Sequence, residues 1–266
     1  MSNRRLSRRV LIRRLLLTLA VIAVLWVGFA FVALRMPISG EVTYALDWVW
    51  GAAQPLSEGG ESGWRVTTTA GVEVTVREGY LGSYSLQLIY CPHKHSPLSW
   101  LFGEIITARA GHGEGIDVTR YLASAIEPLA RPTRFVLGTV SGNEPLYCEG
   151  HYLAARPDRA AAEAQPTTSM VGVTLWLSGE YRLPGATSAM PFTFRTSLAN
   201  GAIRDILDGA GNAAPIPMDG KTYRVIIERR LDRLFEGIDF STATPESGGK
   251  DVLWALIAET RFVRED

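Results

Sequence analysis

The chain has 266 residues, equal numbers (27 each) of Lys+Arg and Asp+Glu, 47% hydrophobic residues and two cysteines. This composition excludes a disordered chain, a collagen and a disulfide-dense mini-protein, and it predicts one or two ordinary domains. The zero net charge combines two unlike parts, because residues 1–35 hold seven arginines and no acid. Residues 36–266 therefore carry 27 acids against 20 Lys+Arg, a net charge of −7. Nucleic acid is excluded as a partner, since phosphate binding needs a basic surface.

An unbroken apolar run covers residues 15–34. Its 20 residues would span about 30 Å as a helix, which matches the hydrocarbon core of a bilayer. Six arginines precede the run and one follows it. The positive-inside rule therefore predicts a single-pass protein of the inner (cytoplasmic) membrane, with residues 1–14 in the cytoplasm and residues 36–266 in the periplasm or outside the cell. Three lysines against 24 arginines are typical of a GC-rich, bacterial genome.

The alternative interpretation of this run is a cleaved signal peptide. Residues 15–27 would form its apolar region, and Gly28-Phe29-Ala30 would be the small-x-small cleavage site. The preceding residues 7–13, Ser-Arg-Arg-Val-Leu-Ile-Arg, are similar to a twin-arginine export signal. Both interpretations export residues 36–266 from the cytoplasm.

Most of the exported part has the pattern of β-strands. In residues 41–50 apolar side chains alternate with polar ones, as a half-buried strand requires, although a short interfacial helix bearing Trp48 and Trp50 is the alternative. Ala70-Gly71 is typical of a hairpin turn between two strands. The expected strands cover residues 41–50, 64–69, 72–77, 84–91, 134–140, 146–154, 169–178, 190–197, 222–229 and 252–263.

Two short segments favour helix. Asp117 is a good N-cap, and an apolar stripe with helical spacing follows it before Pro128; the stripe comprises Val118, Tyr121, Leu122 and Ala125. Residues 203–207 are a second, shorter candidate. Residues 156–168 are expected to be a loop or a short helix, and they are the best internal domain boundary. Because strands and helices do not alternate, the pattern predicts a mainly β (α+β) fold, an antiparallel sandwich or open barrel with minor helices.

Every histidine and both cysteines fall within residues 91–151; they are Cys91, His93, His95, His112, Cys148 and His151. Two cysteines in an exported domain usually pair, so we expect a disulfide between Cys91 and Cys148. It would close a loop of about 58 residues and stabilise the fold by roughly 4 kcal/mol in the chain-entropy model.

The alternative use of this cluster is a copper or zinc site formed by His93, His95, His112 and His151. Alternation along an extended chain places Cys91, His93 and His95 on one side, and imidazole suits both metals. The spacing matches no standard structural zinc pattern. In addition, Cys148 and His151 share an ion only if the chain turns at Gly150. Apart from copper or zinc, no cofactor is expected.

A glycine-rich loop at residues 110–117 precedes the expected helix, and His112 with Glu114 could act there as an acid/base pair. No GxSxG, HExxH or SxxK motif accompanies them. The sequence therefore predicts a non-enzymatic, membrane-anchored binding or assembly module of the bacterial cell envelope, with the membrane and other envelope proteins as partners. The alternatives are a periplasmic metal-handling protein and, more weakly, a hydrolase-type enzyme centred on His112.

Overall fold

The computed structural model describes residues 18–19, 21–26, 39–56, 62–91, 118–164 and 170–265. The chain divides into two compact units, Met1–Ile38 and Ser39–Asp266. In the first unit the described residues, 18–19 and 21–26, are helical. The second unit contains all the strands, and the boundary expected near residues 156–168 lies inside it.

The prediction of a single-pass inner-membrane anchor is corrected. Among the described residues, no helix is long and apolar enough to cross a membrane. The proposed cleavage site at Gly28-Phe29-Ala30 and the twin-arginine segment 7–13 lie outside the described residues.

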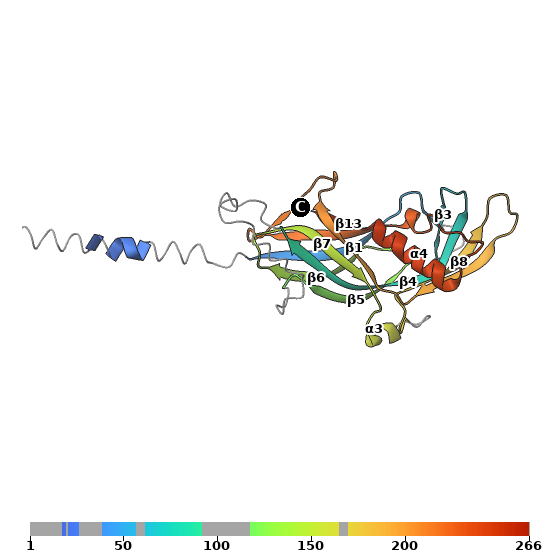
Figure 1. Cartoon of the computed structure of the whole chain (residues 1–266), viewed down its shortest axis with the longest axis horizontal. Helices are drawn as coiled ribbons and strands as arrows, with labels where there is room; N and C mark the ends of the chain where they lie inside the picture. Colours follow the sequence, from blue (N-terminus) through green and yellow to red (C-terminus); the bar gives the residue numbers. More distant parts are fainter. Residues whose placement is uncertain are drawn as a thin grey trace, which may run out of the picture. The chain divides into compact units, whose positions relative to one another are not determined.

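The second unit is mainly β, with one large mixed sheet and few helices (Figure 1). Its described elements are β1 (Gly40–Val49), β2 (Gln54–Pro55), β3 (Trp64–Thr67), β4 (Glu73–Tyr90), β5 (Tyr121–Pro128), β6 (Phe135–Gly142), β7 (Leu146–Ala154), α3 (Arg159–Glu163), β8 (Leu175–Arg182), β9 (Met190–Thr196), β10 (Asn200–Leu207), β11 (Ile216–Pro217), β12 (Thr222–Arg230), the 3-10 helix η1 (Leu231–Arg233), α4 (Pro245–Ala258) and β13 (Arg261–Glu265).

The sheet runs in the order β2-β3-β4-β7-β10-β13-β12-β1-β6, with β5 and β8 also on β4, β9 on β8 and β11 on β7. The prediction of a wholly antiparallel sheet is wrong, because β1 pairs with β12 in parallel and β10 pairs with β13 in parallel. Such pairs arise where the chain crosses over before it returns to the sheet. Between β10 and β13 that crossover includes α4.

Strand β4 organises the sheet. Two strands expected at residues 72–77 and 84–91 are one strand of 18 residues. Its first half pairs with β3 and β8, and its second half pairs with β5 and β7. The expected hairpin at Ala70-Gly71 is confirmed, since it joins β3 to β4 and Gly71 has a positive φ of 78°.

The helix expected after Asp117 is wrong, because residues 121–128 form β5 instead. The strand pairs antiparallel with β4. Successive side chains of a strand point to opposite faces. Tyr121 therefore packs on the core, whereas Leu122 is exposed. A helical stripe this short is marginal by itself, and the edge of β4 offers backbone partners along the whole segment. Asp117 lies outside the described residues.

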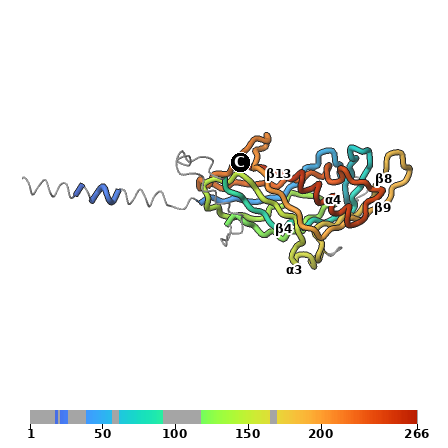
Figure 2. Tube along the Cα trace, viewed as in Figure 1, coloured from blue at the N-terminus to red at the C-terminus, as the bar shows by residue number. Residues whose placement is uncertain are grey.

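The C-terminal region also differs from expectation. Residues 203–207, expected as a helix, belong to β10, and the strand expected at 252–263 is α4 followed by β13. Thr244 caps α4 in a capping box with Ser247. This Thr-x-x-Ser sequence is the signal for a helix start that the strand interpretation missed. Helix α4 packs against β9, with further contacts to β8 and β10 (Figures 1 and 2).

The apolar side chains that alternate along β1 point into the interior. Val42, Tyr44, Leu46 and Trp48 of β1 are all buried, which confirms the expected first strand. In the described part of the chain β5 pairs through its backbone only with β4, yet side chains also link its region to β1 and β6. The Tyr44 hydroxyl donates to the Thr119 carbonyl at 2.8 Å, and the Tyr121 hydroxyl donates to the Leu137 carbonyl at 2.7 Å.

We expect Gly150→Ala to destabilise the fold. Gly150 of β7 faces the protein interior, where an added Cβ would overlap the buried ring of Phe262. Overpacking of this kind costs about 1–3 kcal/mol. In urea denaturation the matched control Gly209→Ala, whose Cβ meets no atom within 4 Å, should stay within about 0.5 kcal/mol of the wild type. Equal stability of the two variants would contradict this placement of Gly150.

Candidate functional site

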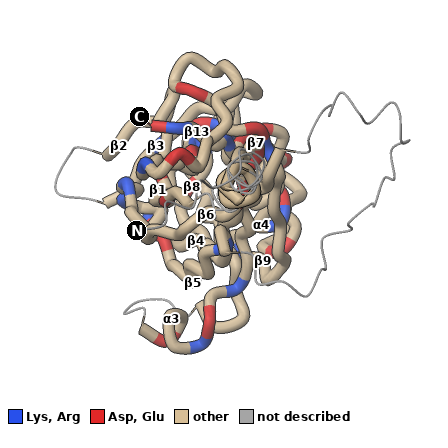
Figure 3. Tube along the Cα trace, turned by 90° about the vertical axis from the view of Figure 1, so that its left-hand side faces the viewer, with Lys and Arg blue, Asp and Glu red and all other residues tan. Residues whose placement is uncertain are grey.

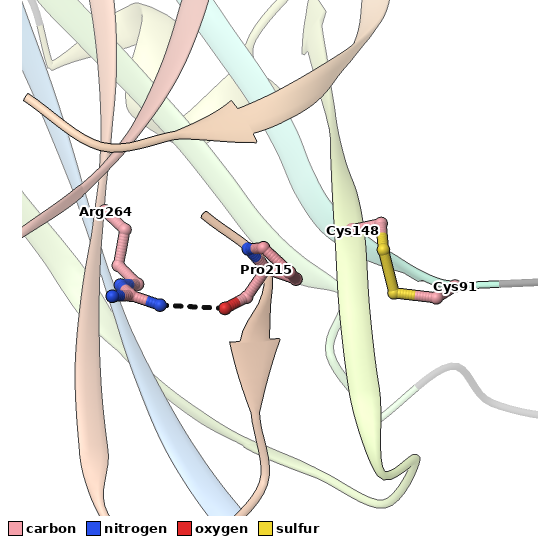
Figure 4. The surroundings of a disulfide bond; sticks show 4 residues. All are labelled: Cys91, Cys148, Pro215 and Arg264. Atoms are coloured by element: carbon pink, nitrogen blue, oxygen red, sulfur yellow. Dashed lines mark hydrogen bonds between the residues drawn. A yellow bond between two sulfur atoms is a disulfide. The ribbon is translucent and has the colours of Figure 1, made fainter. Parts of the chain in front are cut away.

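The expected disulfide is confirmed. The sulfur atoms of Cys91 and Cys148 are 1.96 Å apart and the two Cα atoms 5.0 Å apart (Figure 4). Cys91 directly follows β4, and its N–H donates to the carbonyl of Leu146 at 3.0 Å. The bond therefore fastens the end of β4 to β7 where backbone pairing between these strands ends. Nearby, an Arg264 Nη1 donates to the Pro215 carbonyl at 2.8 Å, which ties β13 to the segment before β11 (Figure 4).

The predicted copper or zinc site is only partly visible. His93, His95 and His112 lie outside the described residues, as does Glu114. His151 lies within β7, and Gly150 makes no turn there, so Cys148 and His151 do not come together as a C-x-x-H site. Within the described ranges, no group of three or more His, Cys, Asp or Glu side chains could hold a metal ion. The metal site and the enzyme centred on His112 remain predictions.

A buried ion pair is the strongest polar feature of the interior, and the sequence analysis missed it. Arg229 of β12 donates both terminal nitrogens to Glu127 of β5, each at 2.6 Å. Arg229 is 0% exposed and Glu127 4% exposed. Alternation along the strand is the sequence signal for the burial of Arg229. Val225, Ile227 and Arg229 are spaced two residues apart, so the arginine shares a face with two apolar side chains.

Three more side chains complete this buried cluster. The Trp48 indole N–H donates to Glu127 at 3.2 Å, and the Arg229 guanidinium lies 4.3 Å from the centre of the Trp48 ring. Ser83 donates to Glu127 at 2.5 Å and is hydrogen-bonded to the Tyr152 hydroxyl at 2.6 Å. Burial lowers the pKa of Arg229, but the charges of Glu127 and Tyr152 and the hydrogen bonds to both together outweigh burial, so the pKa is raised above its ordinary value. Burial likewise raises the pKa of Tyr152.

The buried cluster can hold strands together, but it cannot act on a substrate. All five of its side chains are buried, so no reactant can reach them without opening the core. A bidentate arginine–carboxylate pair has strict geometry. It therefore fixes β5 relative to β12 and β1, to which β5 is not hydrogen-bonded through its backbone.

Exposed polar and apolar side chains lie together on the outer side of β5, β4, β7 and β10. We call this surface the β4/β7 outer face. Strand register places its side chains in three cross-strand rows, which are Leu122-Ser85-Leu153-Gly201, Gln87-His151-Ile203 and Ile89-Glu149-Asp205. Leu122 is 59% exposed and Ile203 is 51% exposed. Apolar residues therefore flank this face on two strands that are separated by β4 and β7.

Glu149 and Asp205 are direct cross-strand partners on the β4/β7 outer face. Like charges in this position destabilise a sheet. Neither carboxylate has an ion pair or side-chain hydrogen bond with another residue in the described part of the chain. Two acids thus face one another, and no described residue supplies a compensating cation.

The outer side of β6, β1, β12 and β13 shows the opposite arrangement. Arg134 donates to Asp47 at 2.9 Å and to Glu265 at 3.2 Å, and Arg224 donates to Glu265 at 2.8 Å. Acidic and basic positions accordingly lie next to one another on β13 near the C-terminus (Figure 3). Ion pairs thus offset part of the charge on this side, although Asp47 and Glu228 are also direct cross-strand partners of like charge. No described cation pairs with Glu149 or Asp205.

We expect Glu127→Leu to lower the free energy of unfolding by about 3–5 kcal/mol, because it leaves the charge of Arg229 buried without its partner. The double variant Glu127→Leu/Arg229→Met removes both charges and keeps the bond between Ser83 and Tyr152. It should therefore be more stable than the single variant in urea denaturation. A double variant that is no more stable than the single one would contradict the pairing.

We expect His151 to make stability depend on pH. Burial, and then the charge of Arg120, lower the pKa of His151 below its ordinary 6.5. The native state then binds fewer protons than the unfolded state, so this contribution to stability is complete above pH 6.5 and is lost as the pH falls through the lowered pKa. Urea titrations of the wild type should show this loss below pH 6.5, and His151→Gln should show less of it. Identical pH profiles would exclude the effect.

No family model, curated protein or solved structure matches this chain. Its function must therefore be argued from the chemistry of its own residues.

Proposed function

We propose that the chain is a non-catalytic binding or assembly module that acts through the β4/β7 outer face. One observation carries the proposal, which is the uncompensated pair Glu149 and Asp205 beside the exposed side chain of Ile203. A sheet gains stability by placing opposite charges across strands. A like-charge pair next to exposed apolar surface is better explained by a partner that supplies the missing cation.

The frame behind this face is rigid. The disulfide fastens β4 to β7 at one end of the face, and the pair of Arg229 and Glu127 fixes β5 from inside. Of the two arrangements predicted from sequence, a sandwich and an open barrel, the interior links from β5 to β1, β6 and β12 favour the open barrel. A rigid scaffold suits binding, because little order has to be imposed on the face when a partner docks.

Charge complementarity supports, as the partner, a protein segment with a basic side chain between apolar ones. The basic group would sit between Glu149 and Asp205, and the apolar groups would cover Ile203 and Ile89. Arg120, whose charge lowers the pKa of His151, precedes β5 on the side of the face opposite β10, and Arg204 of β10 donates to the carbonyl of Ile203 at 3.1 Å. Among the described residues neither arginine forms an ion pair with Glu149 or Asp205. The acids on β7 and β10 are thus left for the partner.

A basic, apolar peptide tests this assignment. We expect Ac-Val-Lys-Val-Arg-Val-NH₂, added to the full chain, to shift backbone amide resonances of β7 and β10. The acidic counterpart Ac-Val-Glu-Val-Asp-Val-NH₂ should not shift them. Asp205→Lys should weaken binding of the basic peptide about tenfold, because it places like charges across the interface.

The same substitution separates binding from folding. Asp205→Lys replaces a repulsive cross-strand pair by an attractive one, so it should raise the free energy of unfolding by about 0.2–1 kcal/mol while it weakens binding. Asp251→Lys, on the exposed surface of α4, makes the same change in net charge and should leave the peptide's affinity unchanged. Resonance shifts that map elsewhere, or equal effects of the two variants, would refute the proposal.

A further inference from the structure

We infer that the loops following β1 and β5 form a binding site for a small apolar carboxylate. A concave site of about 270 Å³ lies between these loops, β2 and the segment that enters β3. Its described lining comprises Trp50, Pro55, Leu56, Ser62, Gly63, Ala130, Arg131, Pro132 and Thr133. None of these residues belongs to the β4/β7 outer face, so this site is independent of the function proposed above.

The polar groups of this carboxylate site are hydrogen-bond donors. Arg131 and the indole of Trp50 can only donate, and the hydroxyls of Ser62 and Thr133 can donate or accept. Among the described lining residues none carries a carboxylate. A site whose described lining offers donors and a positive charge but no anion favours an anionic acceptor.

Arg131 differs from the neighbouring arginines because it has no partner in the described part of the chain. Three residues later, Arg134 is bound to Asp47 and Glu265. Arg65, on the adjoining β3, donates to Gln54 at 3.4 Å. The guanidinium of Arg131 is therefore available to a ligand.

Backbone and side-chain hydrogen bonds hold the walls of the site in place. The Trp64 indole donates to the carbonyl of Leu129 at 2.8 Å, and the N–H of Leu129 donates to Gly79 at 2.8 Å. On the opposite wall, the N–H of Leu56 donates to the carbonyl of Gly63 at 3.0 Å. Both walls are thus formed before any ligand enters, which is typical of small-molecule sites.

The walls and the volume define the rest of the ligand. Pro55, Leu56, Ala130 and Pro132 offer apolar surface, and the Trp50 ring can stack on a flat group. The volume is below the roughly 300–1,000 Å³ of sites for drug-sized ligands. A single ring or a short aliphatic chain that bears one carboxylate therefore fits the site.

Titration of the full chain with benzoate, followed through backbone amide resonances, tests the inference. We expect saturable shifts at residues 50–56 and 130–133, and much weaker binding of benzamide, which has the same shape without the charge. Arg131→Gln should weaken benzoate binding about tenfold, the value of one charge-assisted hydrogen bond. Arg159→Gln, a matched loss of charge on α3, should leave the affinity unchanged.

A second arm identifies the source of the carboxylate. The peptide Ac-Gly-Gly-Phe with a free C-terminus is compared with its C-terminal amide, so that binding of a chain terminus is distinguished from binding of a free small acid. Binding of either carboxylate that depends on Arg131 supports the site. Equal affinity for benzoate and benzamide, benzoate binding unaffected by Arg131→Gln, or no saturable shift with either carboxylate would overturn it.

Discussion

The ion pair between Arg229 and Glu127 joins parts of the sheet that backbone hydrogen bonds leave apart. In the described chain β5 pairs only with β4, and β6 pairs only with β1. Side chains crossing the interior therefore set the position of β5 against β1 and β12. A buried pair of charges is costly to desolvate, and its attraction offsets that cost only where the geometry is good and other hydrogen bonds complete it. The bonds from Trp48 and Ser83 complete the hydrogen bonding of Glu127, whereas the buried Nε of Arg229 has no hydrogen-bond partner among the described residues.

The polar residues of the chain divide into three environments with different consequences. Those in the interior are bonded to one another and hold strands. Those on the outer side of β1, β12 and β13 form ion pairs, such as Arg224 with Glu265, that satisfy charge within the fold. Glu149, Asp205 and Arg131 belong to neither group, because the described chain supplies no opposite charge for them. Unmatched charges are the best candidates for a functional surface, since folding alone does not require them.

Local patterns predicted most strands but not the way the strands meet. Alternation was sufficient for β1, β7, β9 and β12, and the presence of two cysteines was sufficient to name the disulfide partners. Periodicity failed for β5, where apolar residues with helical spacing lie on both faces of a strand, and for α4, whose start is marked by the cap at Thr244. The parallel pairing of β1 with β12 and the partner of Arg229 depend on residues more than 100 positions away, so no local pattern could identify them. The carboxylate site was missed for the same reason, because its walls come from loops about 70 residues apart in sequence.

Strand β5 connects the structural features of the fold to both proposed sites. Leu122, near its start, lies on the β4/β7 outer face, and Glu127, near its end, is held by Arg229. Two residues later, the carbonyl of Leu129 accepts from the Trp64 indole and its N–H donates to the carbonyl of Gly79. These two bonds fix the backbone between β5 and Arg131. The placement of Arg131 thus follows from interactions that begin in the buried cluster. The ion pair acts here as a positioning element for β5, which carries Leu122 and leads to Arg131, although it touches neither proposed ligand.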